Sequence, residues 1–231
     1  MKILVTGNQG YIGSVLSPYL SSRGYQVRGL DIGYFAECLL NSVDEPVEQI
    51  RKDIRVVESR DVEGVDAVIH LAALSNDPLG ELSPEYTKQI NYDGTLRLAS
   101  LAKRAGVRRF VYASSQSMYG VSQKSEELTE DESEKNPITI YARTKWEAEC
   151  ELNKLNSRAF EVVSMRPSTV FGPSPRLRCD IVFNNLLACA HTTGAIEIKS
   201  DGTPWRPVIH IEDVCKAFLA AVEAPAEIVS G

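Results

Sequence analysis

Residues 3–13 read Ile-Leu-Val-Thr-Gly-Asn-Gln-Gly-Tyr-Ile-Gly, an apolar strand that runs directly into three glycines spaced three residues apart. The apolar residues fit a buried parallel strand, and Gly7 fits the tight turn that follows it. Gly10 lets the backbone approach a phosphate closely, and Gly13 lets the next helix pack near the sheet. That helix directs its free N–H groups at the phosphates. The stretch therefore predicts a site for the pyrophosphate of a dinucleotide.

A second apolar strand, residues 26–30, follows the first helix and ends at Asp31, eighteen residues after Gly13. A carboxylate at this place accepts hydrogen bonds from the ribose hydroxyls of the adenosine and repels a 2′-phosphate. An aspartate in an ordinary turn is the alternative interpretation. With the strand and the glycines at the right spacing, Asp31 predicts NAD as the cofactor in preference to NADP.

The composition is that of an ordinary globular protein. With 231 residues, 43% hydrophobic and 24% charged, the chain can bury one sizeable core and is not of the disordered class. The net charge of −6 favours neither a nucleic-acid partner nor an anionic membrane. No apolar run approaches the roughly 20 residues of a membrane span, and the N-terminal apolar stretch is too short for a signal peptide, so we expect a cytoplasmic protein.

Five cysteines are scattered along the chain without a Cys-x-x-Cys pair: Cys38, Cys150, Cys179, Cys189 and Cys215. This pattern indicates neither a zinc site nor a disulfide framework. We therefore expect no bound metal and reduced cysteines that serve as packing residues.

Predicted strands and helices alternate along the chain, which is typical of an α/β protein with a Rossmann-type, doubly wound parallel sheet. The expected strands are residues 2–6, 26–30, 49–52, 66–71, 109–113 and 161–166, and the expected helices are residues 11–23, 84–105, 139–157 and a closing helix near 211–224. Beyond residue 166 the alternation loosens, and proline, glycine and arginine become frequent. We divide the chain into a dinucleotide-binding domain, 1–166, and a small, incomplete substrate lobe, 167–231, whose segments interleave with the main domain.

Two motifs lie where predicted strands end. His70-Leu-Ala-Ala-Leu-Ser75 passes from an apolar strand to small residues, which either let the backbone lie close to a flat ligand or pack a helix tightly on the sheet. Val111-Tyr-Ala-Ser-Ser-Gln-Ser-Met-Tyr-Gly120 delivers several hydroxyls and an amide into a loop. These groups are either catalytic or simple loop caps.

Tyr141-Ala-Arg-Thr-Lys145 lies at the start of a predicted helix. A spacing of four residues places the phenol and the ammonium side by side on one helix face. A nearby cation favours the phenolate, so Tyr141 can act as a base near neutral pH, and Lys145 can hydrogen-bond the nicotinamide ribose. A chance occurrence of the pair is the alternative, but it follows a dinucleotide motif and a strand end rich in serine.

Together these residues resemble the NAD-dependent nucleotide-sugar epimerase/dehydratase family of extended short-chain dehydrogenase/reductases, of which UDP-glucose 4-epimerase is the best-known type. The matching segments are Thr6–Gly13, Asp31, Lys52–Arg55, His70–Ala73, Asn91–Thr95, Ser114–Gly120, Tyr141–Lys145, Arg166–Pro167, Phe171–Pro173 and Arg206–Asp213. Their order and spacing cover nearly the whole chain. They specify the family and leave the sugar open.

The resemblance implies a role for each matching residue. Ser115 would hydrogen-bond the sugar hydroxyl that is oxidised, Tyr141 would remove its proton while C4 of the sugar gives a hydride to NAD, and Lys145 completes the catalytic set. The implied cofactor-binding residues are Gly7, Gly10, Tyr11, Ile12, Gly13, Asp31, Asp53, Ile54, Leu71, Ala72, Ala73, Asn91, Tyr141, Lys145 and Pro167. The implied substrate-binding residues are Ser75, Gln116, Ser117, Thr169 and Arg206, with Arg206 as the clamp for the substrate diphosphate.

Three features depart from the family pattern. Dehydratases of the family place Asp-Glu where this chain has Gln116-Ser117, and without that acid pair the loss of the 6-hydroxyl lacks its usual agents. Many members place an asparagine where this chain has Thr169. Family members also continue beyond the closing helix with further strands and helices of the substrate lobe.

We therefore expect an NAD-dependent epimerase that acts on a nucleotide-diphosphate sugar through a transient 4-keto intermediate. A nucleotide-4-keto-sugar reductase is the alternative within the family, with a 4,6-dehydratase behind it. A catalytically silent dinucleotide sensor is the alternative from a different class. The resemblance also implies a homodimer formed through the helices at 84–105 and 139–157. Leu96, Leu98 and Leu101 on the first of these fit either a dimer interface or burial against the sheet.

Overall fold

A parallel sheet of six strands forms the centre of the molecule, for which a computed structural model describes residues 1–41, 48–75, 77–121, 128–198, 200–201 and 207–229. The strands are β1 (Lys2–Thr6), β2 (Gln26–Asp31), β3 (Glu48–Arg51), β4 (Ala67–His70), β5 (Arg109–Ala113) and β6 (Glu161–Met165). Their order is β3-β2-β1-β4-β5-β6, and every neighbouring pair is parallel. The Rossmann-type sheet predicted from the sequence is confirmed, with each strand within two residues of its expected bounds.

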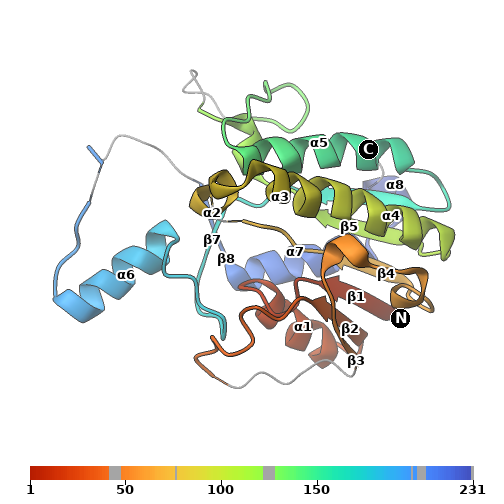
Figure 1. The fold of residues 1–231 in the computed structure, drawn as a ribbon, viewed down its shortest axis with the longest axis horizontal. Helices are drawn as coiled ribbons and strands as arrows, with labels where there is room; N and C mark the ends of the chain where they lie inside the picture. The colour runs from red at the N-terminus through yellow and green to blue at the C-terminus, as the bar shows by residue number, and fades with distance from the viewer. Residues whose placement is uncertain (42–47, 76, 122–127, 199, 202–206, 230–231) are drawn as a thin grey trace.

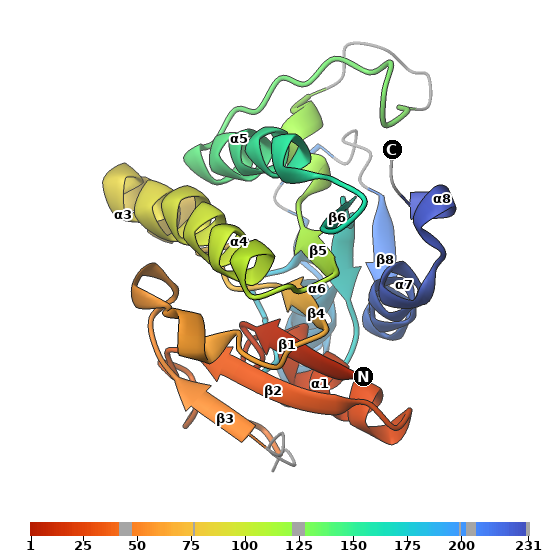
Figure 2. The ribbon, with the colours of Figure 1, turned by 90° about the vertical axis from the view of Figure 1, so that its right-hand side faces the viewer.

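Two layers of helices cover the sheet. Helices α1 (Gly13–Ser22) and α7 (Ile211–Glu223) lie on one face, and α4 (Gly94–Arg104) and α5 (Ile140–Leu155) lie on the other (Figures 1 and 2). The strand order reverses between β1 and β4, so a crevice forms beyond the carboxyl ends of these two strands. In sheets of this type ligands bind in that crevice.

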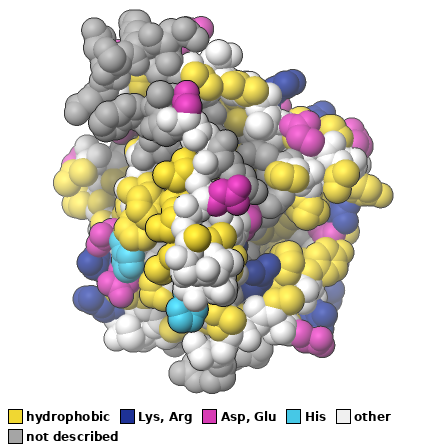
Figure 3. All heavy atoms as spheres, turned by 90° about the vertical axis from the view of Figure 1, so that its left-hand side faces the viewer, with side chains coloured by type: hydrophobic (Ala, Val, Ile, Leu, Met, Phe, Trp, Pro, Cys, Tyr) yellow, Lys and Arg dark blue, Asp and Glu magenta, His cyan; other side chains and the backbone are white. Residues whose placement is uncertain are grey.

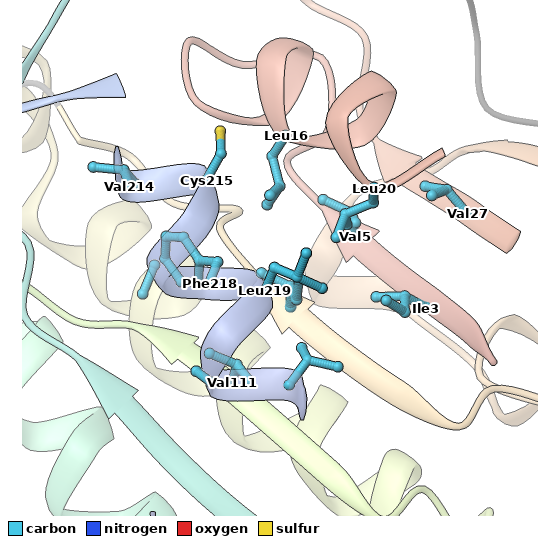
Figure 4. Packing of buried hydrophobic residues seen from close by; sticks show 14 of the residues in the cluster. Ile3, Val5, Leu16, Leu20, Val27, Val111, Val214, Cys215, Phe218 and Leu219 are labelled. Carbon is cyan, nitrogen blue, oxygen red and sulfur yellow. The ribbon is translucent and has the colours of Figure 1, made fainter. Parts of the chain in front are cut away.

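The alternation of side chains along the strands builds a core on each face. Ile3 and Val5 belong to the cluster shared with α1 and α7, whereas Leu4 between them belongs to the cluster shared with α4 and α5. Figure 4 shows Phe218 and Leu219 of α7 in the same cluster as Leu16 and Leu20 of α1 and Ile3 and Val5 of β1. Because fully burying one large apolar side chain contributes about 1.5–3 kcal/mol, the two clusters hold the sheet rigid under the site.

The helix expected at residues 84–105 is confirmed, but it contains a turn of a different kind. The chain forms α3 (Pro84–Lys88), then one turn of π-helix at Gln89–Asp93, then α4, and a short α2 (Asp77–Leu82) precedes them. A π turn adds a residue to the helical circuit and changes where side chains point. The π turn itself was not predicted, and inside it the amide of Asn91 is bonded to the backbone of the loop after β4.

The last third of the chain forms a smaller layer beyond the carboxyl ends of the strands. Strands β7 (Thr169–Phe171) and β8 (Val208–His210) form a parallel pair, and α6 (Val182–Thr193) projects away from the sheet (Figure 1). The face from which α6 projects carries many hydrophobic side chains (Figure 3). The division at residue 166 stays a prediction. Helix α7 from the second range packs on the sheet of the first, and a short α8 (Ala226–Val229) follows it.

The expectation that all five cysteines are packing residues is only partly right. All five are free thiols, and Cys215 is buried in the core between α7 and α1. Cys38 and Cys179 are exposed, so the packing interpretation is wrong for these two. Within the described part of the chain, no helix is long and apolar enough to cross a membrane, and His, Cys, Asp and Glu side chains nowhere gather in groups of three that could hold a metal ion.

Candidate functional site

The glycine-rich turn connects β1 to α1 at the point where the strand order reverses. Gly7 has a φ of +73°, and a Cβ there would lie 2.7 Å from the backbone nitrogen of Ala72. A Cβ on Gly13 would lie 2.2 Å from the carbonyl oxygen of Gly7. No larger residue fits either position, so the predicted roles of these glycines in the tight turn and in helix packing agree with the geometry. Gly10 donates its N–H to the Gly7 carbonyl at 3.0 Å, which closes the turn.

The loop after β4 lies against this turn. The backbone N–H of Leu71 donates to the carbonyl of Thr6 at 3.0 Å, and the hydroxyl of Thr6 accepts from the N–H of Ala72 at 3.4 Å. Leu71, Ala72 and Ala73 are half-buried. Small residues in this loop therefore let two backbone segments meet at the crevice. This close approach fits tight packing, and it also leaves the backbone of the loop near a ligand in the crevice, so both interpretations made from the sequence stay open.

Asp31 ends β2 beside the turn. One carboxylate oxygen accepts the backbone N–H of Gln9 at 3.1 Å, and the other accepts that of Gly33 at 2.8 Å. These two bonds fix the carboxylate at the rim of the glycine-rich turn, where the ribose of a dinucleotide would lie. A closed turn at a helix N-terminus with a fixed carboxylate beside it fits NAD, whose pyrophosphate needs N–H donors and whose ribose needs acceptors.

Asp53 and Ile54 follow β3 near the same rim. The Arg55 guanidinium binds both oxygens of Asp53 and holds the pKa of that carboxyl below its usual range. The side chain of Ile54 is buried in the core cluster beneath α4, so a contact with a bound adenine would come from the backbone. Tyr11 and Ile12 lie at the entry to α1, where Tyr11 is buried and Ile12 is half-buried.

Lys145 is buried at the centre of the site. Its Nζ donates to the carbonyl oxygen of Ala113 at 2.7 Å, lies 4.8 Å above the ring of Tyr112 and is 6.0 Å from the centre of the Tyr141 ring. Burial lowers the pKa of Lys145 to about 7. The structure thus brings Tyr141 and Lys145 together as the four-residue spacing predicted. Helix α5 is capped at its N-terminus by Thr139, whose hydroxyl accepts the N–H of Ala142 at 3.2 Å.

Ser115 lies two residues beyond the carbonyl that holds Lys145. It caps a short 3₁₀ helix, Gln116–Tyr119, and its hydroxyl accepts the N–H of Ser117 at 3.1 Å. That short helix packs against α5, which carries Tyr141 and Lys145. The backbone N–H of Gln116 donates to the carbonyl of Pro167 at 3.3 Å. Strand β5 therefore positions two of the predicted catalytic residues from successive points of its carboxyl end.

Asn91 connects the loop after β4 to helix α5 beside Lys145. Its amide oxygen accepts the N–H of Leu74 at 2.8 Å, and its amide nitrogen donates to the Leu74 carbonyl at 3.0 Å and to the Thr144 hydroxyl at 3.4 Å. Asn91 is fully buried. Asn91, which the resemblance places among the cofactor-binding residues, therefore supports the surroundings of Lys145, because its partner Thr144 precedes that lysine in the chain.

A chain of buried hydrogen bonds runs under the crevice. The imidazole of His70 bonds to the hydroxyls of Thr6 at 2.6 Å and Thr95 at 2.7 Å, and Thr95 donates to the Asn91 carbonyl at 2.7 Å. Burial, and secondarily the charge of Lys145, lowers the pKa of His70 to about 3. His70 is thus neutral at physiological pH and connects the glycine-rich turn to the π turn.

The segment after β7 is connected to the glycine-rich turn. The Tyr11 hydroxyl donates to the carbonyl of Gly172 at 2.8 Å and accepts the amide N–H of Asn184 at 3.1 Å, and burial raises the pKa of that phenol. Ser174 donates to the Tyr11 carbonyl at 2.8 Å. Neither Asn184 nor Ser174 was predicted as a site residue, because their contacts cross about 160 residues and no local spacing signals them.

The predicted substrate-binding residues divide into three groups. Ser75 is exposed, and its hydroxyl accepts from the guanidinium of Arg178 at 3.0 Å. Arg178 also binds Asp180 and was not predicted as a site residue. Gln116 and Ser117 are half-buried next to Ser115, and Thr169 is half-buried in β7. Arg206 lies outside the described residues.

The comparison with known families decides the assignment. A model of the family described as "NAD dependent epimerase/dehydratase family" matches residues 3–231. The chain belongs to this family. The resemblance stated from the sequence is therefore confirmed, as is the family's use of NAD.

Individual members of the family are moderately similar to the chain. UDP-glucose 4-epimerase of Mycolicibacterium smegmatis is 32% identical over 236 residues, which is 96% of this chain and 73% of that protein. A mouse dTDP-D-glucose 4,6-dehydratase is 29% identical, and the match covers 96% of this chain but only 64% of the dehydratase. The solved structure of UDP-glucuronic acid 4-epimerase from Bacillus cereus, in complex with UDP-glucuronic acid and NAD, has a TM-score of 0.81 and 30% identity, covering 99% of this chain and 75% of that one.

Proposed function

We propose that the chain catalyses the NAD-dependent epimerisation of a nucleotide-diphosphate sugar at C4. The observation that carries this proposal is the Tyr141 ring beside a buried lysine, with that lysine bonded to the strand that delivers Ser115. Two of the similar proteins described above are UDP-sugar 4-epimerases, which supports the same reaction for this chain. The chain spans 64–73% of the length of the two curated relatives described above. The activity of those longer proteins is therefore proposed for this chain.

The cofactor site would be formed by the glycine-rich turn, Asp31 and the loop after β4. Gly7 and Gly13 keep the turn tight against the sheet, Gly10 lets the backbone approach the pyrophosphate, the N-terminus of α1 offers it N–H groups, and Asp31 accepts from the ribose. When bound, NAD supplies the hydride acceptor for C4 and returns the hydride to either face of the ketone.

The protein groups would handle the proton. Tyr141 takes the proton of the C4 hydroxyl and returns it after the sugar has turned, while the Ser115 hydroxyl holds the same oxygen. Lys145 in its cationic form favours the phenolate of Tyr141, and because its pKa is about 7 it changes charge near neutral pH. The net reaction is redox-neutral, since the hydride taken from C4 returns to C4 and the proton taken from its hydroxyl returns to that oxygen.

The substrate would lie between the strand ends and the segment after β7. Ser75, Gln116, Ser117 and Thr169 are our candidates for sugar contacts, and Arg206 is our candidate for the diphosphate. Gln116 and Ser117 cannot protonate a leaving 6-hydroxyl as an acid pair can, which favours epimerisation over 4,6-dehydration.

The test incubates the purified chain with NAD and a panel of UDP-, GDP-, CDP- and dTDP-sugars, with products separated by anion exchange. We expect one sugar to be converted into its C4 epimer without net change in nicotinamide absorbance. Tyr141→Phe should abolish turnover and keep NAD binding. Net consumption of NADH with a keto-sugar would instead identify the reductase, and NAD binding without conversion of any sugar would identify the silent sensor.

We further propose that the chain forms a homodimer through α3, α4 and α5. Leu98 and Leu101 lie in the core of the protomer and Leu96 packs against the same core, so these leucines do not themselves supply an interface. Sedimentation at micromolar concentration tests the dimer, and a monomer would contradict it. The cytoplasm stays our predicted location, which fractionation of cells that express the tagged chain would test.

A further inference from the structure

A buried ion pair lies behind the predicted catalytic residues. Glu149 is on α5, one helical turn beyond Lys145 and two beyond Tyr141, and only 1% of its surface is exposed. The Nε of Arg166, the residue that follows β6, donates to Oε1 of Glu149 at 3.0 Å. A residue spacing of four keeps all three side chains of α5 on one face, so the ion pair shares a face with the site.

The same arginine reaches the loop that carries Ser115. Its Nη1 donates to the hydroxyl of Tyr119 at 2.7 Å and to the carbonyl of Glu130 at 2.8 Å. The guanidinium also lies 5.7 Å from the rings of both Tyr119 and Trp146. Tyr119 is the last residue of the 3₁₀ helix that Ser115 caps. Arg166 therefore contacts both elements that carry the predicted catalytic groups.

We propose that Arg166 is a positioning residue that fixes the Ser115 loop against the Tyr141–Lys145 face of α5 through Glu149 and Tyr119. The proposal rests on the function proposed above for these three residues. A planar guanidinium can satisfy two partners at a fixed angle, which a flexible ammonium cannot. The separation of Ser115 from Tyr141 is thereby set by one rigid group.

Net stability is a poor explanation for this pair. Buried ion pairs roughly balance their desolvation cost, and the second oxygen of Glu149 is buried with no hydrogen-bond partner among the described residues. The pair therefore contributes geometry more than free energy. A pair of the same kind at the other end of the sheet provides a control: Arg109 of β5 binds Glu161 of β6 at 2.8 and 2.6 Å, also buried.

The first test is kinetic and compares Glu149→Gln with Glu161→Gln. Each substitution weakens one buried pair, but only the first pair contacts the site. We expect Glu149→Gln to lower kcat by about tenfold or more with KM changed less than about threefold, and Glu161→Gln to leave kcat within about twofold of wild type. Arg166→Lys should recover only part of the activity lost in Arg166→Met, because the ammonium of a lysine lacks the fixed planar fork of donors that holds Glu149 and Tyr119 at a set angle. Equal kcat values for the two glutamine variants would overturn the proposal.

The second test does not depend on turnover. The N–H groups of Ser117, Met118 and Gly120 bond within the Ser115 loop, so their hydrogen exchange reports its order. Tyr119→Phe removes one hydroxyl, keeps the ion pair and should raise exchange of these amides by about fivefold or more. Tyr25→Phe, which removes a hydroxyl bonded to Glu223 far from the site, should leave that exchange unchanged.

The exchange experiment separates this inference from the proposed function. If wild type converts no sugar but Tyr119→Phe and Glu149→Gln both loosen the loop, the positioning inference stands and the epimerase proposal fails. If the loop amides exchange at wild-type rates in both variants, the positioning inference is wrong whatever the kinetics of wild type.

Discussion

Replacing Lys145 by methionine should stabilise the protein while it destroys the proposed activity. Methionine is unbranched and one heavy atom shorter than lysine, so it keeps most of the side-chain length and removes the ammonium. Burial lowers the lysine pKa from 10.5 to about 7. At about 1.4 kcal/mol per pH unit, the buried cation costs about 4–5 kcal/mol at or below neutral pH. Loss of the bond to Ala113 and of the contact with the Tyr112 ring offsets part of this, so we expect a net gain of about 1–3 kcal/mol at pH 7.

The pH dependence gives a sharper signature than the gain itself. Between the folded pKa near 7 and the unfolded value of 10.5, the unfolded chain still binds a proton that the folded protein has released. Stability of wild type therefore rises with pH through this window, by about 2 kcal/mol between pH 7 and pH 9. Below pH 7 both states are protonated at this residue and its contribution is constant.

The assay is urea unfolding of wild type and Lys145→Met without cofactor, at a series of pH values from about 6 to 9. The difference between the two proteins isolates Lys145, because other groups that titrate are common to both. We expect the advantage of the variant to shrink by about 2 kcal/mol between pH 7 and pH 9. A difference that stays constant with pH would refute the claim that the lysine is destabilised by burial.

Three further predictions concern the crevice. Gly7→Ala should lower stability by at least about 2 kcal/mol more than Gly64→Ala and weaken NAD binding, as urea unfolding and titration would show; both glycines have positive φ, but only at Gly7 would the Cβ meet backbone, that of Ala72. Asp31→Asn should weaken NAD binding by about tenfold and NADP binding less, and an unchanged NAD affinity would contradict the ribose role. The free energy of unfolding of wild type should fall by about 2–3 kcal/mol between pH 6.5 and pH 4.5. The unfolded chain takes up a proton at His70 in this range, whereas folded His70, with its pKa near 3, stays neutral. In urea unfolding, His70→Gln should have a weaker dependence on pH over the same range.

The parts of the fold that follow from local patterns were predicted from the sequence. The strand before Gly7, the glycine spacing, and the helix that carries Tyr141 depend on residues within a few positions of one another, and periodicity reads such patterns well. The parallel, doubly wound sheet followed because alternating strands and helices need crossover connections, which leave few topologies. The pairing of Tyr141 with Lys145 was predictable for the same reason, since helix geometry alone determines it.

Contacts between distant segments escaped prediction. The π turn at Gln89–Asp93 depends on Asn91 meeting Leu74, and helix propensity over residues 84–105 carries no sign of that meeting. The contacts of Tyr11 with Gly172 and Asn184 depend on how the segment after β7 returns over the sheet. In each case a polar side chain in an ordinary local context becomes significant only through a partner far along the chain.

Most of the buried side-chain oxygens that lack a hydrogen-bond partner lie near one edge of the sheet, and each of them lowers the stability of the fold. Among the described residues, five buried side-chain oxygens have no hydrogen-bond partner. Four of them belong to Tyr112, Ser114, Glu149 and Ser164 on or next to β5, β6 and α5, and the fifth belongs to Ser17 of α1. Each such oxygen costs about 1–3 kcal/mol. The strand that contains Tyr112 reads as an uninterrupted core strand in the sequence, yet its phenol lies beneath the ammonium of Lys145. A sequence selected for core stability alone would have apolar residues at these positions. We infer that the polar side chains of β5, β6 and α5 are kept because this edge of the sheet holds the buried ammonium of Lys145.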